Sequence, residues 1–304
     1  MIEAAAVAPS TRVALVTCAD LADLDPDDRL LLAPLAERGV AAQPVVWDDP
    51  DADWSAYDLV VLRSPWDYVQ RRDAFVAWAI RVARLANPAD VVAWNTDKRY
   101  LGELAAAGVP VVPTSWVAPA DPWILPESGE WVIKPAISAG SKDTGRYLAD
   151  DPDHRALAAA HVARLQAAGR LVMVQPYLAG VDHHGETALL FLGGAYSHAI
   201  RKGAMLDGPD HGVDGLYRAE EIITREPSAA ERAVAAAALA AVPGGADRLL
   251  YARVDLLPGP DGEPLLIELE LTEPSLFLGT SPDAVDRFAD AIAARAALGA
   301  EQPT

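Results

Sequence analysis

The chain has 304 residues, of which 51% are apolar, and its formal net charge is −19. This length predicts two or three domains, with enough apolar residues to bury a core. The acidic balance, without any run of Lys or Arg, argues against nucleic-acid binding and against docking on anionic membranes.

A single cysteine, Cys18, excludes an intramolecular disulfide and a cysteine metal cluster. Its apolar neighbours predict a small buried side chain. No apolar stretch reaches the ~20 residues that a membrane span needs. Residues 1–10 lack the basic start of a signal peptide. We therefore expect a cytoplasmic protein with a flexible leader over residues 1–10.

The first segment, residues 12–93, alternates predicted strands with predicted helices. Strands are expected at 12–19, 40–47, 58–63 and 91–94, and helices at 26–38 and 71–86. This alternation predicts an α/β domain with a parallel sheet.

A turn from Ser64 to Tyr68 follows one of these strands, at the sheet edge where open α/β sheets bind ligands. Arg63, Trp66 and Tyr68 are therefore candidate substrate contacts. A structured turn with buried aromatic side chains is the alternative.

Two further units, residues 94–180 and 181–300, show a mixed α+β pattern. Strands are predicted at 111–114, 131–134, 171–178, 186–192, 196–201, 251–257 and 264–271. Helices are predicted at 96–107, 152–168, 228–241 and 283–298. Gly-containing loops fill 138–145 and 203–215.

The strongest local signal is a hairpin of strands 251–257 and 264–271 around a turn at 258–263. Direct pairing places Arg253 opposite Glu268, and Asp255 opposite Leu266; a bulge would break this register. Because successive side chains alternate, one face carries charge and the other faces a core. The charged face holds Arg253, Asp255, Glu268 and Glu270, and the core face holds Val254, Leu256, Ile267, Leu269 and Leu271.

Three carboxylates on one strand face suit Mg²⁺, which prefers a few carboxylate oxygens together with substrate phosphates. A solvated strand face with a surface ion pair is the alternative.

Two lysines and a loop suggest a phosphate site. Lys134 ends an apolar strand and needs an anionic partner, and Lys98 opens a helix. The backbone N–H groups of the loop at 138–145 can cradle phosphate oxygens. It is not a P-loop, because Arg146 and Tyr147 replace the Lys-Ser/Thr pair. Surface lysines and a surface turn are the alternatives.

These residues, in this order, resemble the ATP-grasp superfamily over residues 95–278. Arg253-x-Asp255 followed by Glu268-x-Glu270 resembles the metal motif of D-alanine–D-alanine ligases, with Glu270 in place of the usual Asn. Gln175 stands in place of the usual acidic hinge residue. The short chain is most similar to small ligases, which include the cyclo-ligase that closes the cycloserine ring and relatives of the ribosomal-protein and glutathione ligases.

The resemblance implies an ATP-grasp fold, with ATP between the last two units, and a set of site residues. Nucleotide contacts fall on Lys98, Lys134, Ser138, Gly140, Ser141, Gln175, Tyr177, Leu178, Asp182 and Glu186, with Asp182 or Glu186 at the ribose. Metal ligands are Asp255, Glu268 and Glu270. Catalytic roles fall on Arg253 and Lys202. Substrate contacts fall on Arg63, Trp66, Arg201 and Ser275.

The implied reaction joins a small-molecule carboxylate to an amine through an acylphosphate, with ATP and Mg²⁺ or Mn²⁺. The substrate would resemble an amino acid, and ring closure within one molecule is one form of the reaction. No nucleic acid or membrane partner is expected, and a homodimer is left open. A kinase that stops after phosphoryl transfer and a nucleotide-binding regulator are the alternatives.

Overall fold

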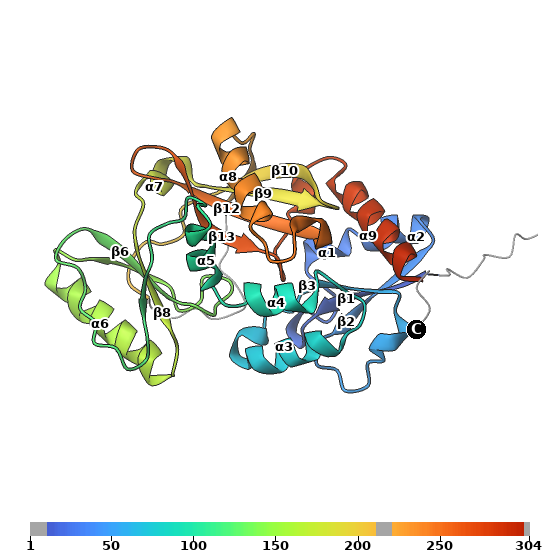
Figure 1. Ribbon diagram of the computed structural model, residues 1–304, viewed down its shortest axis with the longest axis horizontal. Coiled ribbons are helices and arrows are strands. Elements are labelled where there is room, and N and C mark those ends of the chain that lie inside the picture. Colours follow the sequence, from blue (N-terminus) through green and yellow to red (C-terminus); the bar gives the residue numbers. More distant parts are fainter. Residues whose placement is uncertain (1–10, 211–220, 301–304) are drawn as a thin grey trace, which may run out of the picture.

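The structure is a computed structural model that describes residues 11–210 and 221–300, so part of the predicted loop at 203–215 and the predicted leader lie outside it. Three sheets organise the described residues (Figure 1). No helix among these residues is long and apolar enough to cross a membrane.

The N-terminal sheet is parallel, as predicted, with the strand order β2-β1-β3-β4. Its strands are β1 (Thr11–Thr17), β2 (Val40–Val46), β3 (Leu59–Ser64) and β4 (Leu85–Ala86). Every residue of β3 is buried, as expected for a parallel strand with helices on both faces. Cys18 is buried, as predicted.

The elements around this sheet differ from the prediction in three places. The predicted helix at 71–86 ends at Arg81, and Leu85 and Ala86 form the strand β4. The predicted helix at 26–38 is split into α1 (Pro26–Arg29) and α2 (Leu32–Glu37), because Pro34 has no N–H to donate to Leu30 and its ring would clash there. The predicted strand at 91–94 is wrong, since these residues lie in α4 (Ala89–Asn95). Helix α3 (Arg72–Arg81) packs on one face of the sheet, and α9 (Ala284–Ala300) packs on the other.

The central sheet is antiparallel and has the order β5-β8-β6-β7. Its strands are β5 (Ser115–Val117), β6 (Glu130–Pro135), β7 (Gly145–Leu148) and β8 (Val172–Pro176). Helix α6 (Pro152–Ala167) covers one face. The predicted strand at 111–114 does not form, and Val111 makes only an isolated bridge to Leu266.

The last sheet is antiparallel with the order β11-β10-β9-β12-β13. Its strands are β9 (Glu186–Leu192), β10 (Ala195–Lys202), β11 (Ile222–Thr224), β12 (Tyr251–Pro258) and β13 (Pro264–Glu270). Helices α5 (Tyr100–Ala106) and α8 (Ala229–Ala240) pack in the core on one face, and α9 packs on the other. A short helix that the sequence did not predict, α7 (Gly180–His184), precedes β9.

Each predicted unit, 12–93, 94–180 and 181–300, thus supplies the strands of one sheet, while their boundaries as domains stay a prediction. Helix α5 falls in the second predicted unit but shares a core with the last sheet, through Tyr100 and Leu101 against Leu269. In Figure 1 the central sheet and α6 stand at the left, apart from the other two sheets, which α9 joins.

The predicted hairpin register is wrong by two residues near the charged end. Arg253 lies opposite Glu270, and Asp255 lies opposite Glu268. A bulge next to Leu256 then shifts the pairing, so that Leu266 is buried in the core and Ile267 lines the cavity described below. An extra residue in one strand changes which side chains share a face beyond it. The four charged residues lie before the bulge and keep the common face.

Candidate active site

One cavity lies between the central and the last sheets and is closed at one end by the turn after β3. It gathers most of the residues predicted from the sequence. These are Trp66, Lys98, Lys134, Ser138, Gly140, Ser141, Gln175, Tyr177, Leu178, Glu186, Lys202, Arg253, Asp255, Glu268, Glu270 and Ser275.

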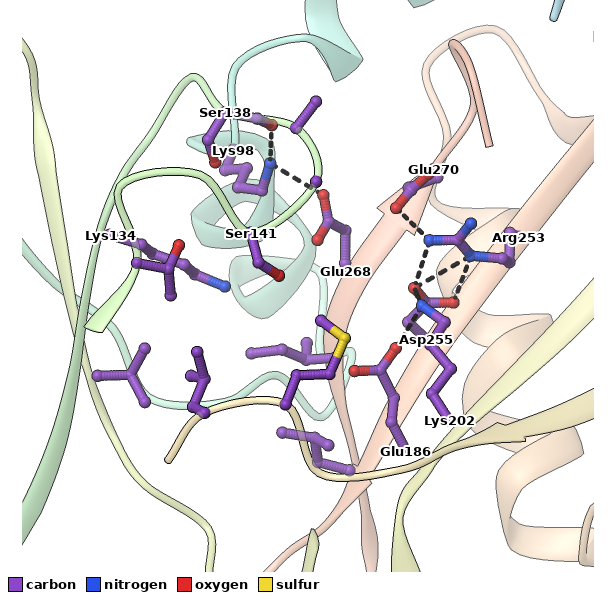
Figure 2. Close-up of a pocket in the computed structure, with 18 of the residues that line it drawn as sticks. Lys98, Lys134, Ser138, Ser141, Glu186, Lys202, Arg253, Asp255, Glu268 and Glu270 are labelled. Atoms are coloured by element: carbon purple, nitrogen blue, oxygen red, sulfur yellow. Dashed lines mark hydrogen bonds and ion pairs between the residues drawn. The ribbon is translucent and has the colours of Figure 1, made fainter. Parts of the chain in front are cut away.

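Two networks of charged side chains occupy this cavity (Figure 2). In the first, Lys98 Nζ lies 2.9 Å from Glu268 Oε1 and donates to the Ser138 carbonyl at 2.8 Å. In the second, Lys202 Nζ donates to Glu186 at 2.7 Å and to Asp255 at 2.8 Å. Arg253 joins this network by donating to Asp255 and Glu270. Each of the three predicted metal ligands therefore forms an ion pair with a lysine or arginine side chain in this structure.

Lys134 differs from these cations. It projects from β6, is only 9% exposed, and makes no hydrogen bond or ion pair with any residue that the structure describes (Figure 2). Burial lowers the pKa of Lys134 to about 8, although the charge of Glu268 opposes the shift. A buried ammonium without a counterion is unfavourable, so this position is suited to an anionic ligand.

The carboxylates of the cavity differ in their pKa values. Burial raises the pKa of Glu270 to about 8 and that of Glu186 to about 7, despite Arg253 and Lys202 nearby. Burial also acts on Asp255, but the charges of Arg253 and Lys202 outweigh it and hold the pKa of that carboxyl well below its usual range. The site could therefore accept a further cation beside Glu270.

The opposite part of the cavity is mainly apolar, and it contains one buried polar atom without a partner. Gln175 Nε2 donates to Thr114 Oγ1 at 2.9 Å. That hydroxyl in turn donates to the Val112 carbonyl, which fixes the orientation of the Gln175 amide. Gln175 Oε1 is then left buried without a donor in the described part of the chain. The apolar lining includes Val132, Leu178, Leu206, Leu257 and Ile267. A flat heterocycle with an amino group fits such surroundings.

At the third side of the cavity, three consecutive carbonyls are each held by a side chain. The Glu273 carbonyl accepts from Trp66 Nε1 at 3.0 Å. The Pro274 carbonyl accepts from Arg63 at 2.8 Å, and the Ser275 carbonyl accepts from Arg253 at 3.1 Å. The turn after β3 and the strand β12 together fix the segment that follows β13.

Comparison with known proteins identifies the family. A cycloserine biosynthesis protein, DcsG of Streptomyces lavendulae, is 45% identical over 302 residues, covering 93% of this chain and 98% of that protein. The chain belongs to the DcsG family of ATP-grasp ligases.

Other comparisons agree with this membership. Residues 13–87 match the family described as D-cycloserine synthetase DcsG, N-terminal domain. The crystal structure of D-cycloserine synthetase DcsG superposes with a TM-score of 0.82 at 43% identity, over 94% of this chain and 99% of that one. A D-alanine–D-alanine ligase from Bacillus anthracis shares the fold, with a TM-score of 0.63 at 16% identity over 97% and 100% of the two chains.

This DcsG-family chain is thus an enzyme, an ATP-dependent ligase that joins a carboxylate to an amine in small-molecule biosynthesis. The predicted superfamily and fold are confirmed.

Three predicted site residues do not line the cavity of this DcsG-family ligase. Arg63 is fully buried and pairs with Asp28 at 2.8 Å, so it supports the fold. Arg201 donates to the His184 carbonyl at 2.9 Å and precedes Lys202 in β10, so strand alternation turns it away. Asp182 lies in α7, where it accepts a hydrogen bond from Tyr177.

Some residues that line the cavity had no predicted role. Glu273 is one of these residues: it lines the cavity and accepts a hydrogen bond from Tyr68. Met205 and Leu206 also line the cavity, from the loop after β10. Their position depends on how that loop crosses the central sheet, where Arg146 N donates to the Gly208 carbonyl at 2.8 Å. No local motif in the sequence indicated this crossing.

Proposed function

We propose that this ligase closes a ring within one amino-acid molecule, by joining its carboxylate to an aminooxy-type nitrogen of its own side chain. The observation that carries the proposal is the near full-length match to a cycloserine synthetase, together with a single cavity that brings the lysines, the carboxylates and Arg253 together. Cycloserine contains such a cyclic amide-type bond.

ATP would lie with its adenine in the apolar part of the cavity, where Gln175 Oε1 can accept from the adenine amino group beside Tyr177 and Leu178. Its phosphates would supply the counterion that Lys134 does not find among the described residues. Lys98 and the loop residues Ser138, Gly140 and Ser141 lie beside them. Glu186 lines the cavity and Asp182 does not, which favours Glu186 among the two candidate ribose contacts.

Magnesium fits the carboxylate end. Glu270 Oε2 accepts no hydrogen bond from the described residues, and burial, together with the charges of Glu268 and Asp255, raises the pKa of Glu270 to about 8. Glu268 and Glu270 would hold the metal. The oxygens of Asp255 are engaged by Lys202 and Arg253, so Asp255 can join only if one of these cations releases it. A bound Mg²⁺ would neutralise phosphate charge during transfer.

The chemistry requires two balanced steps. A carboxylate oxygen of the amino acid attacks the γ-phosphorus of ATP and releases ADP, which gives an acylphosphate. The nitrogen then attacks the acyl carbon, a C–N bond forms, phosphate leaves and the nitrogen loses a proton. Arg253 and Lys202 would stabilise charge on the transferred group. Met205 and Leu206 would help to exclude water, which hydrolyses acylphosphates.

The test measures ADP release across a panel of amino acids, with mass spectrometry of the products. Opening the amide of cycloserine gives O-amino-D-serine, so the panel contains both enantiomers of this compound, their N-acylated derivatives, and D-alanine. We expect a cyclic product that has lost water relative to O-amino-D-serine. Formation of a dipeptide would refute ring closure, and ADP release without any new C–N bond would favour a kinase.

A further inference from the structure

We propose that Glu273, held by Tyr68, binds the α-ammonium group of the amino-acid substrate. The proposal rests on the proposed function for the identity of that amino acid, and on the contacts of the cavity for the role of Glu273.

The charged side chains that line the cavity are not all paired among the described residues. The cavity is lined by five carboxylates, Glu186, Asp255, Glu268, Glu270 and Glu273, and by four cations, Lys98, Lys134, Lys202 and Arg253. Four of the carboxylates form ion pairs with these cations. Glu273 forms none with any residue that the structure describes. It is the anionic counterpart of Lys134, so a cationic ligand group is what this position lacks.

The side chains of Tyr68 and Trp66 hold Glu273 in place. Tyr68 Oη donates to Glu273 Oε1 at 2.7 Å, and Oε2 accepts no hydrogen bond from the described residues. Tyr68 is itself fixed, because its ring stacks on Phe75 with centroids 4.6 Å apart. Trp66 Nε1 donates to the backbone carbonyl of Glu273. The carboxylate is therefore pre-positioned, with one oxygen left for a ligand.

Glu273 is close in the sequence to the residues proposed to act in phosphoryl transfer. It follows Glu270 by three residues, and Arg253 contacts both Glu270 and the Ser275 carbonyl. In an α-amino acid the ammonium nitrogen and the carboxyl carbon are bonded to the same atom. An ammonium bound at Glu273 would thus keep the carboxylate near Arg253, where phosphoryl transfer is proposed. Burial raises the pKa of Glu273 to about 7, and a bound ammonium would relieve that unfavourable charge.

The experiment compares binding of two probes, O-amino-D-serine and 3-(aminooxy)propanoate, which lacks only the α-amino group. Both are titrated by calorimetry into the full chain with Mg²⁺ and a non-hydrolysable ATP analogue. We expect the unmodified protein to prefer O-amino-D-serine by about 30-fold, in line with one charge-assisted hydrogen bond. Glu273→Gln should reduce the preference to about threefold or less and leave the affinity for 3-(aminooxy)propanoate nearly unchanged.

The matched control is Glu263→Gln, which removes the same charge from an exposed position in the turn of the same hairpin and should keep the preference. Tyr68→Phe keeps the charge but frees the carboxylate, and should give an intermediate preference; it replaces Glu273→Gln if that variant does not fold. If the role of Glu273 were purely structural, Glu273→Gln would reduce the affinity for both probes equally.

The inference is overturned if Glu273→Gln keeps the full preference, or if the unmodified protein binds the two probes equally or binds neither. If the protein shows the preference and Glu273→Gln loses it, but no cyclic product forms, ring closure fails while the ammonium site stands.

Discussion

Replacing Lys134 by Met should weaken ATP binding and at the same time stabilise the protein without ligand. The ammonium is buried and has no counterion among the described residues, so it contributes to binding but opposes folding. Loss of a charge-assisted contact to phosphate is expected to reduce the free energy of ATP binding by about 2–3 kcal/mol, or roughly 30- to 150-fold in Kd. Met keeps the length of the side chain and leaves little cavity.

The stabilisation can be sized from the pKa. A change from 10.5 to about 8 makes the charged form less favourable in the folded protein by about 3 kcal/mol at neutral pH. Between pH 8 and 10.5 the unfolded chain keeps this proton while the folded protein releases it. The free energy of unfolding should therefore rise with pH across this window, and Lys134→Met should remove that rise. ATP affinity should fall above about pH 8, because phosphate binding needs the protonated lysine.

The assays are calorimetric titration with ATP and urea denaturation, both from pH 7 to 10. Lys142→Met is the matched control, because Lys142 belongs to the glycine loop that follows β6 but does not line the cavity. The ATP affinity of the Lys142→Met variant should differ from that of the unmodified protein by less than about threefold, because a solvent-accessible charge contributes little interaction energy. Equal losses for the two variants, or a larger loss at Lys142, would refute the assignment of Lys134 to phosphate. A less stable Lys134→Met protein would refute the argument from burial.

Four other variants test neighbouring groups. Glu268→Gln should release Lys98, so that metal-free ATP binds more tightly than to the unmodified protein, while magnesium-dependent ADP release falls at least about 100-fold. Loss of the ion pair to the buried Lys98 should also lower Tm, so activity is measured well below the unfolding transition of the variant; full activity would remove Glu268 from the metal site. Glu270→Asn should lose only about tenfold in the same assay, because it keeps an oxygen ligand. Gln175→Leu should reduce the preference for ATP over inosine triphosphate, measured as the ratio of kcat/KM, by about tenfold. Arg63→Met should lower the free energy of unfolding by about 3–5 kcal/mol, and adding Asp28→Leu should recover most of it in urea denaturation; a change in substrate KM alone would contradict this structural role.

The regular elements were predictable where their pattern was long and their ends were marked. Residues 186–192 form β9 with the predicted bounds, and α6 begins at Pro152 after the Asp151 cap. The run at 91–94 shows the limit of such patterns. Its β-branched and aromatic residues are typical of a strand, but it forms a helix because Val91 packs in a core with Tyr100.

The site was predictable as a set of residue types, but the pairing within it was not. Alternation along β12 and β13 correctly predicted one charged face, and a bulge changed only the apolar residues beyond it. Contacts between distant parts of the chain carry no local signal. Tyr68 and Glu273 are 205 residues apart, and Arg63 reaches the Pro274 carbonyl across 211 residues. For that reason Arg63 was predicted to bind substrate, and Glu273 received no role.

Two charged residues of the cavity, Lys134 and Glu273, have no ion-pair partner among the described residues. In the part of the chain that the structure describes, Lys134 on the central sheet has no anionic partner, and Glu273 on the segment after the last sheet has no cationic partner. In the proposed binding mode, a nucleotide phosphate would complement Lys134 and an amino-acid ammonium would complement Glu273. Lys202, Arg253 and Asp255 line the same cavity and form a network in which opposite charges already pair with one another. Such a network needs little reorganisation when negative charge moves from ATP to the acyl group, because its dipoles are already held in place. On this proposal, the charges without partners among the described residues lie where ligands would bind, and the paired charges lie where the phosphoryl group would be transferred.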